Sequence, residues 1–170
     1  MILNWKKENR LLFTLSLVCI IAIIIMVVSL CIPKEAEQPP FVPPPFDVNA
    51  IVGEPTVPDN LGYSVLYREG MSFKVGICGK INITANSADV YLTNLSENHA
   101  WLKVRFYDQA GRMIGESGLV RPGEYLKGIT LDIVPHTTEG IILKIMSYEP
   151  DTYNSLGSIT LTPKVVIIEE

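Results

Sequence analysis

The stretch from Leu11 to Ile32 contains twenty-two consecutive residues without a charge, and it constrains this chain more than any other feature. As a helix that rises about 1.5 Å per residue, such a run reaches roughly 30 Å, the thickness of the hydrocarbon core of a bilayer. Its polar residues are Thr14, Ser16 and Ser29, whose hydroxyls can bond to a carbonyl of the same helix. The run therefore predicts one transmembrane helix over residues 11–32.

The charges around this run predict its orientation. Three basic residues and one Glu precede it, whereas one Lys and two Glu follow it closely. Because basic residues favour the cytoplasmic side, residues 1–10 are expected in the cytoplasm and the rest of the chain outside. Trp5 stands where an interfacial aromatic ring anchors the inner end. We therefore expect a single-pass protein of the cell membrane with an extracytoplasmic C-terminal part.

Three other interpretations of the same run remain open. A cleaved signal peptide has a shorter apolar region, about 7–15 residues, and ends in small residues. The run Val28-Ser29-Leu30-Cys31 resembles the lipobox of bacterial lipoproteins, although Leu30 stands where that pattern has Gly, Ala or Ser. Phe13-Thr14-Leu15 resembles the start of a type IV pilin helix, with Leu12 and Leu17 in place of its Gly and Glu. An uncleaved signal anchor fits the residues better.

Residues 33–60 read as a proline-rich linker. They hold eight of the twelve prolines, including Pro39-Pro40 and Pro43-Pro44-Pro45. Proline lacks an N–H donor and fixes φ, so this segment is expected to be extended and semi-rigid. A PxxP ligand for SH3-like domains is the alternative, which the expected outward location disfavours. Phe41, Val42 and Phe46 are apolar for a bare linker, and part of the segment can dock on the domain that follows.

Residues 61–170 carry the pattern of an all-β domain. Short runs rich in Val, Ile, Thr and Tyr alternate with turn residues about every ten positions, which is typical of an antiparallel β-sandwich. An additional edge strand is possible at Ser64–Tyr67, and Pro163 predicts an edge or a bulge in the last strand. The seven expected strands lie near residues 72–84, 87–95, 100–107, 112–118, 125–133, 140–148 and 157–168.

Apolar residues at every second position identify the inward faces of these strands. Asp108-Gln109-Ala110-Gly111 predicts a hairpin with Gly at positive φ, and Pro122-Gly123 predicts a type II turn. The expected core consists of Val90, Leu92, Leu102, Val104, Phe106, Ile129, Leu131, Ile133, Ile141, Leu143, Ile145, Ile159 and Leu161.

Several of the expected strands and turns resemble those of a known class of domain. The segments Val90–Asn94, Leu102–Asp108 with Gly111, Ser117–Glu124 and Ile129–Leu131, followed by a closing hairpin, resemble Ig-like or fibronectin-type-III-like domains of Gram-positive surface proteins. Small Firmicute proteins with one span, a spacer and one such domain are similar overall. The resemblance implies an Ig-like sandwich of about seven strands in an anchored binding or scaffolding module, and it implies no activity.

Residues that carry chemistry are sparse. His99 and His136 are far apart and have no partner at metal-ligand spacing, and no nucleophile, P-loop or calcium-loop motif occurs. Cys78 is the one cysteine of residues 61–170, so it is expected to be a small buried residue. Residues 63–170 carry ten Lys or Arg and twelve Asp or Glu, a balance that does not favour nucleic acid. We expect a protein that is not an enzyme and has no cofactor or metal.

The best candidate binding surface is the outward face of the strand at 100–107. Trp101, Lys103, Arg105 and Tyr107 alternate outward there, and Tyr91 is expected to lie alongside them. Aromatic rings beside Arg are frequent in binding hot spots, although the same pattern also occurs on plain sheet faces. The leading hypothesis is a membrane-anchored module that contacts a protein partner in the cell envelope. The alternative is a binder of carbohydrate or wall polymer that stacks sugar rings on the same aromatic residues.

Overall fold

The computed structural model describes residues 2–31, 41–67 and 69–168 and divides the chain into two compact units, Met1–Phe41 and Val42–Glu170. The first unit contains the helix α1 (Ile2–Cys31), in which the side chains of residues 13–27 are described and exposed. Over the described residues, we found no helix whose length and apolar character would suffice to cross a membrane.

The second unit is built of strands. The part of the chain that the structure describes contains eleven of them and one short 3-10 helix, η1 (Asp59–Leu61). The strands are β1 (Ile51–Val52), β2 (Tyr63–Leu66), β3 (Val75–Cys78), β4 (Lys80–Thr84), β5 (Ser87–Asn94), β6 (Trp101–Tyr107), β7 (Met113–Glu116), β8 (Glu124–Thr130), β9 (Ile142–Tyr148), β10 (Ser155–Leu161) and β11 (Lys164–Ile168).

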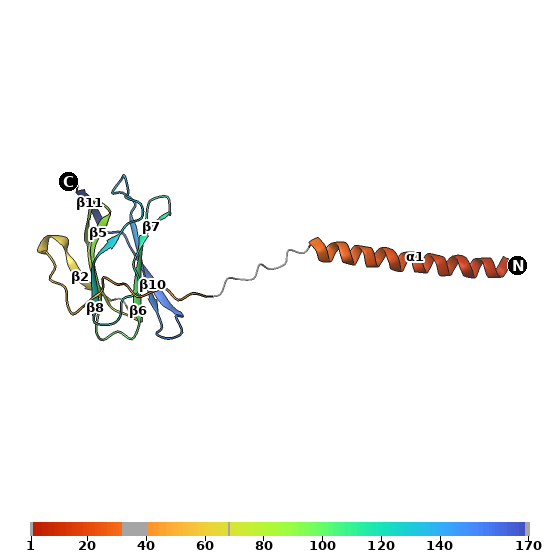
Figure 1. Ribbon diagram of the computed structural model, residues 1–170, viewed down its shortest axis with the longest axis horizontal. Coiled ribbons are helices and arrows are strands. Elements are labelled where there is room, and N and C mark those ends of the chain that lie inside the picture. The colour runs from red at the N-terminus through yellow and green to blue at the C-terminus, as the bar shows by residue number, and fades with distance from the viewer. Residues whose placement is uncertain (1, 32–40, 68, 169–170) are drawn as a thin grey trace. The chain divides into compact units, whose positions relative to one another are not determined.

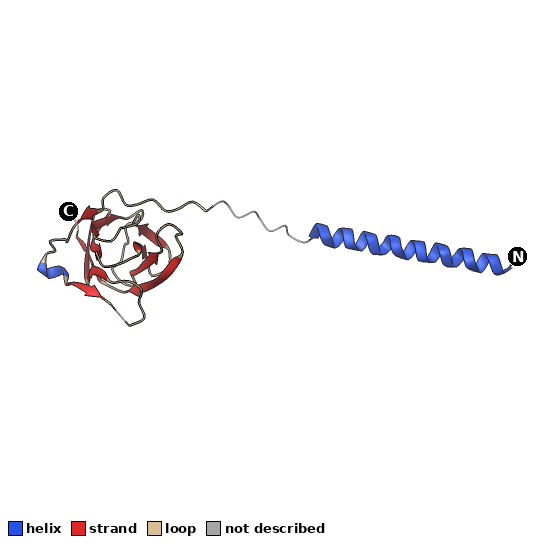
Figure 2. Cartoon of the chain, turned by 90° about the horizontal axis from the view of Figure 1, so that it is seen from below, coloured by secondary structure: helices blue, strands red, loops and turns tan. Residues whose placement is uncertain are grey.

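These strands form two sheets. The larger sheet has the order β1-β8-β5-β3-β2, with β4 beside β5 and β11 beside β4, and the smaller sheet has the order β10-β9-β6-β7. Every pairing is antiparallel except that of β11 with β4. Figure 1 shows the two sheets as separate layers, and Figure 2 shows the strands of the same unit in red from below. The prediction of an all-β sandwich is confirmed.

Two of the predicted strands are each divided in the structure. The predicted strand at 72–84 becomes β3 and β4 on either side of Gly79, and that at 157–168 becomes β10 and β11 on either side of Pro163. Gly79 accepts a hydrogen bond from the backbone N–H of Lys164, and its own N–H donates to Gly62. The chain leaves the smaller sheet after β10 and joins the larger one at β11. Pro163, which cannot donate to a ladder, stands at this crossing.

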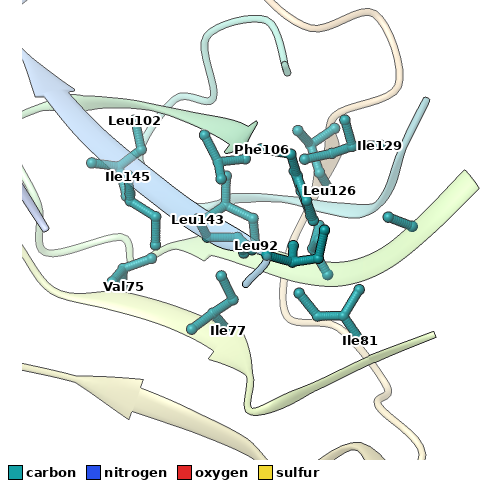
Figure 3. Close-up of a cluster of buried hydrophobic side chains, with 14 of the residues drawn as sticks. Val75, Ile77, Ile81, Leu92, Leu102, Phe106, Leu126, Ile129, Leu143 and Ile145 are labelled. Atoms are coloured by element: carbon teal, nitrogen blue, oxygen red, sulfur yellow. The ribbon is translucent and has the colours of Figure 1, made fainter. Parts of the chain in front are cut away.

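The core lies between the two inner faces. Leu102, Val104 and Phe106 of β6 are completely buried, as the two-residue alternation predicts. Figure 3 shows side chains of the larger sheet, such as Leu92 and Leu126, close to those of the smaller sheet, such as Leu143 and Ile145. Of the predicted core residues, ten are buried, and Ile133, Ile159 and Leu161 are partly buried against them.

The predicted turns are present. Gly111 has φ of 77° and its N–H donates to the carbonyl of Asp108 at 2.9 Å, which closes the β6–β7 hairpin. Gly123 has φ of 79°, and the N–H of Glu124 donates to the carbonyl of Arg121 at 3.1 Å. Both glycines occupy the left-handed region that other residues avoid, so the turn chemistry placed these connections correctly.

Residues 45–62, which we call the strap, belong to the second unit. Phe46 pairs with Leu119, β1 pairs with β8, and Leu61 is buried against Cys78 and Tyr91. Because β1 and β2 lie at opposite ends of the sheet order, the strap crosses the outer face of the larger sheet. The linker predicted over 33–60 therefore divides: residues 42–60 belong to the sandwich unit, and residues 33–40 lie outside the described residues.

Candidate binding face

The outward face of β6 carries four of the five predicted site residues. Trp101, Arg105 and Tyr107 are partly exposed and Lys103 is buried, and all four alternate with the core residues of the same strand. In the register with β9 they lie opposite Tyr148, Met146, Lys144 and Ile142. The structure therefore brings Trp101, Lys103, Arg105 and Tyr107 together.

Tyr91 does not join them, and the expectation that it lies alongside is wrong. It belongs to β5 in the other sheet, is 6% exposed, and packs with Leu61 and Cys78. Its φ of 47° falls where the pairing of β5 with β8 shifts register, between Asp89 and Leu92. Tyr91 alternates with the core residues Val90 and Leu92, so it lies on the outer face of its own sheet, where residues of the strap cover it.

The two cations of β6 are held by one carboxylate. The Lys103 ammonium lies 2.9 Å from one oxygen of Glu116 on β7, and the Arg105 Nε lies 2.8 Å from the other. Burial opposes ionisation of Glu116, but the hydrogen bonds from Lys103 and Arg105 outweigh it and lower the pKa of this carboxyl. The side chain of Lys103 is only 5% exposed, so this cation is part of the packing and is not offered to a ligand.

Trp101 is contacted by two other aromatic rings. The ring of Phe46, from the strap, forms a T-shaped pair with it, with the ring centroids 4.8 Å apart and the ring planes at 79°. The ring of Tyr153, from the β9–β10 loop, has its centroid 5.2 Å from that of Trp101 and is tilted by 59°. The Arg121 guanidinium lies 3.6 Å from the centre of the Phe46 ring, a cation–π contact. We call Phe46, Trp101, Tyr153 and Arg121 the aromatic corner. Its three rings are partly exposed and Arg121 is exposed.

Backbone hydrogen bonds hold the strap beside this corner. The N–H of Leu119 donates to the carbonyl of Pro45, and the N–H of Asp47 donates to the carbonyl of Leu119, both at 2.9 Å. The N–H of Gly118 donates to the Asp47 carboxylate at 2.8 Å. A side chain at Gly118 would meet the backbone of Asp47, because an added Cβ would lie 2.5 Å from its nitrogen. Glycine at position 118 thus permits the close approach that presents Phe46 to Trp101.

Sequence reasoning missed most of the partners of this face. Phe46 was noted as apolar, but nothing in a proline-rich run indicates which strand it contacts. Glu116 is an ordinary acidic residue near a strand end, and Tyr153 lies in a loop between strands. Only the expected pairing of the strands at 100–107 and 112–118 could have suggested that Glu116 lies opposite Arg105, as it does.

Among the cavities lined by described residues, the following two lie away from this face. One, of about 370 Å³, lies between the middle of the strap, β2 and the end of β5, and its lining includes Glu54, Tyr63 and Thr93. The Tyr63 hydroxyl donates to the Thr93 hydroxyl there at 2.8 Å, across Gly76. The other, of about 380 Å³, lies between the β6–β7 hairpin and the loop that contains His136. Neither cavity involves a predicted site residue.

Groups that usually carry catalysis are not assembled among the described residues. His99 and His136 are exposed, as predicted for loop residues. No cluster of three or more His, Cys, Asp or Glu that could hold a metal is found within the described ranges. Cys78 is 2% exposed, and burial, together with the charge of Asp89, raises the pKa of its thiol to about 11. Such a thiol stays protonated near neutral pH and is a poor nucleophile.

Comparison with known proteins gives no relative from which a role could be transferred. No protein-family model matches the chain, and no curated protein matches it either. Any function must therefore be argued from the geometry of the chain itself.

Proposed function

We propose that this chain is a membrane-anchored, extracytoplasmic binding module whose sandwich contacts a protein partner of the cell envelope through the aromatic corner. The observation that carries the proposal is the convergence of three partly exposed rings and one exposed Arg from the strap, β6, the β7–β8 connection and the β9–β10 loop. Aromatic residues and Arg dominate the energetic centres of protein interfaces, because they bury large areas and lose little entropy.

The geometry of Trp101 favours a protein over a carbohydrate as the ligand. Sugar rings stack on an open aromatic face, whereas Trp101 is contacted by Phe46 at 4.8 Å and by Tyr153 at 5.2 Å. A protein surface can instead cover the exposed remainder of all three rings together with Arg121. Lys103 and Arg105 contribute to this face by holding its shape through Glu116.

Membrane attachment is the second element of the proposal, and its support is in the sequence. Residues 11–32 are uncharged, and three basic residues precede them whereas one follows closely, so an uncleaved signal anchor would leave residues 42–170 outside. We further propose that the sandwich is Ig-like and that the chain resembles anchored surface modules of Gram-positive bacteria.

Photo-cross-linking in intact cells that make the protein tests the binding face. A photoreactive phenylalanine analogue replaces Tyr107, which is partly exposed on the outer face of β6, and in a control chain it replaces Lys127, which is exposed on β8 of the other sheet. The proposal predicts an adduct of defined mass from position 107 and none from position 127.

A substitution at the aromatic corner then separates binding from folding. Arg121→Ala should reduce the yield of the adduct at least tenfold, because it removes the exposed cation of the aromatic corner. The long ion pair of Arg121 with Glu124, at 3.4 Å, contributes little to stability, so the sandwich should stay folded. Lys127→Ala is the matched control and should leave the yield unchanged. An adduct that forms equally in the Arg121→Ala chain would contradict the assignment of this face.

A further inference from the structure

One row of side chains crosses the outer face of the smaller sheet. Glu116 of β7, Arg105 of β6, Lys144 of β9 and Thr160 of β10 lie directly opposite one another in successive strands. Opposite residues of neighbouring strands point to the same face of a sheet, with Cβ atoms about 5 Å apart. The first three residues are partly exposed and Thr160 is exposed, so the row is open to solvent. We call these four residues the cross-strand row.

Two like charges meet within the cross-strand row. Arg105 and Lys144 are direct cross-strand partners, an arrangement that destabilises a sheet. One oxygen of Glu116 binds Arg105 and the other binds Lys103, so this carboxylate is already shared by two cations. Lys144 forms no ion pair with any residue that the structure describes. The outward residues of these four strands therefore hold three cations and one carboxylate, an excess of two positive charges.

The positive excess is local, because the sandwich as a whole carries more acidic than basic residues. Strand β10, which lies beside Lys144, has no charged residue. Along the chain, the acidic residues closest to Lys144 are Glu139 and Glu149, each five positions away, and five residues of extended chain span roughly 17 Å. Asp108, just after β6, is paired with Arg112 at 3.0 Å. The charge of Lys144 is therefore available to a group from outside the chain.

We infer that the protein partner presents a carboxylate side chain, from Asp or Glu, which binds between Arg105 and Lys144. The inference rests on the proposed function, because it names the chemistry of the partner at the same face. Trp101 of the aromatic corner lies four residues from Arg105 on β6, roughly 13 Å away, so one interface covers both. The partner carboxylate supplies the negative charge that Lys144 lacks and removes its repulsion with Arg105.

The number and the setting of these cations favour a protein carboxylate over an anionic membrane surface. Anionic lipid surfaces typically attract clusters of about four to eight Lys or Arg residues. Here two partly exposed cations stand side by side on a sheet, and Glu116 holds the Nε of Arg105 at 2.8 Å. Cations that are fixed in this way are too few to hold a lipid surface, but they suffice to place one carboxylate of a shaped protein surface.

Charge reversal at Lys144 tests the inference in the full chain. Lys144→Glu places opposite charges across from one another, so it should raise the urea concentration at the midpoint of unfolding. In intact cells, with the photoreactive group at position 107, the same change should reduce the yield of the adduct at least tenfold. Lys127→Glu, at an exposed position of the other sheet, changes the net charge equally and should leave the yield unchanged. A purely structural role of Lys144 would not give a more stable chain that binds less.

Mapping of the adduct by mass spectrometry completes the test. It should locate the contact on a partner segment with an Asp or Glu, and reversal of that residue to Lys should restore the adduct with the Lys144→Glu chain. An adduct that forms equally with Lys144→Glu would overturn the inference and leave the proposed function standing. An equal loss with Lys127→Glu, or an adduct with a lipid or a polymer, would also overturn it. No adduct from the parent chain would overturn the proposed function and the inference with it.

Discussion

Substitution of Gly118 by Ala should detach the strap from the aromatic corner. The added Cβ would lie 2.5 Å from the nitrogen and 2.6 Å from the Cα of Asp47. These are backbone atoms, which cannot rotate away as the end of a side chain can. The strap must therefore move as a segment, and the ring of Phe46 moves away from Trp101 with it.

The size of the effect follows from the contacts that are lost. Two backbone hydrogen bonds with Leu119 and one from the N–H of Gly118 to the Asp47 carboxylate hold the segment, together with the ring contact of Phe46 and Trp101. Each hydrogen bond contributes about 0.5–1.5 kcal/mol net, and the ring pair contributes a similar amount. Allowing for solvation of the freed groups, we expect a loss of about 2–4 kcal/mol in the free energy of unfolding.

Urea unfolding with a single tryptophan reporter measures this loss. In a Trp5→Phe chain, Trp101 is the only tryptophan, so its emission reports both unfolding and the departure of Phe46. Gly118→Ala should lower the free energy of unfolding and shift the native emission to longer wavelength. Gly79→Ala is the matched control, because an added Cβ there meets nothing closer than 3.4 Å. Neutral surface changes usually stay within about 0.5 kcal/mol of the parent chain. A free energy of unfolding within that range, together with unchanged emission, would show that Gly118 is not needed for the docking of the strap.

Three further predictions concern single side chains. Glu116→Gln should lower the free energy of unfolding by about 1–3 kcal/mol in urea titrations, because the buried Lys103 loses the negative charge that pairs with it. The loss is limited to this range because Glu116 is partly exposed and water screens the ion pair. The pKa of Glu116 is lowered from its ordinary value of 4.5, so its contribution is complete above that pH and is lost as the pH falls through the lower folded value. The parent chain should therefore lose stability more steeply than Glu116→Gln from roughly pH 5 to pH 3, and parallel curves would contradict the ion pair. Cys78 should resist alkylation at pH 8 until urea unfolds the sandwich, as mass mapping of the labelled peptides would show, and rapid native labelling would contradict its burial. Gly76→Ala should displace the ring of Tyr63, which occupies the place of the added Cβ. The free energy of unfolding should fall by about 1–3 kcal/mol in the same urea assay. An unchanged free energy of unfolding would show that the ring moves freely.

The architecture of the sandwich could be predicted because it depends on local patterns. Alternation placed Leu102, Val104 and Phe106 inside, and the turn residues at Gly111 and Gly123 placed two connections. These signals are strong because a strand has a strict two-residue period and positive φ favours glycine. The breaks that split two predicted strands at Gly79 and Pro163 could not be predicted in the same way, because they depend on which neighbouring strand the chain pairs with next.

The candidate site was only half predictable for the same reason. Four of the five predicted site residues lie at alternate positions of β6. Because alternate residues of a strand point to the same face of a sheet, their common face could be predicted. The two-residue period also places Tyr91 on the outward side of its strand, between the core residues Val90 and Leu92, but a single sequence does not reveal that this strand belongs to the other sheet. The docking of Phe46 on Trp101 joins residues 55 positions apart, and proline-rich composition predicts an extended chain without naming its neighbour.

The proposed location of the sandwich outside the membrane can be tested by cysteine labelling in intact cells. Two chains, each with a single added cysteine, Thr160→Cys on β10 or Asn4→Cys before the uncharged run, carry Cys19→Ser and Cys31→Ser and are treated with a membrane-impermeant maleimide. An anchored, outward-facing sandwich should be labelled at position 160 in intact cells, and position 4 should be labelled only after lysis. Labelling at position 4 with protection of position 160, or protection of both until lysis, would contradict an anchored module displayed outside the cell.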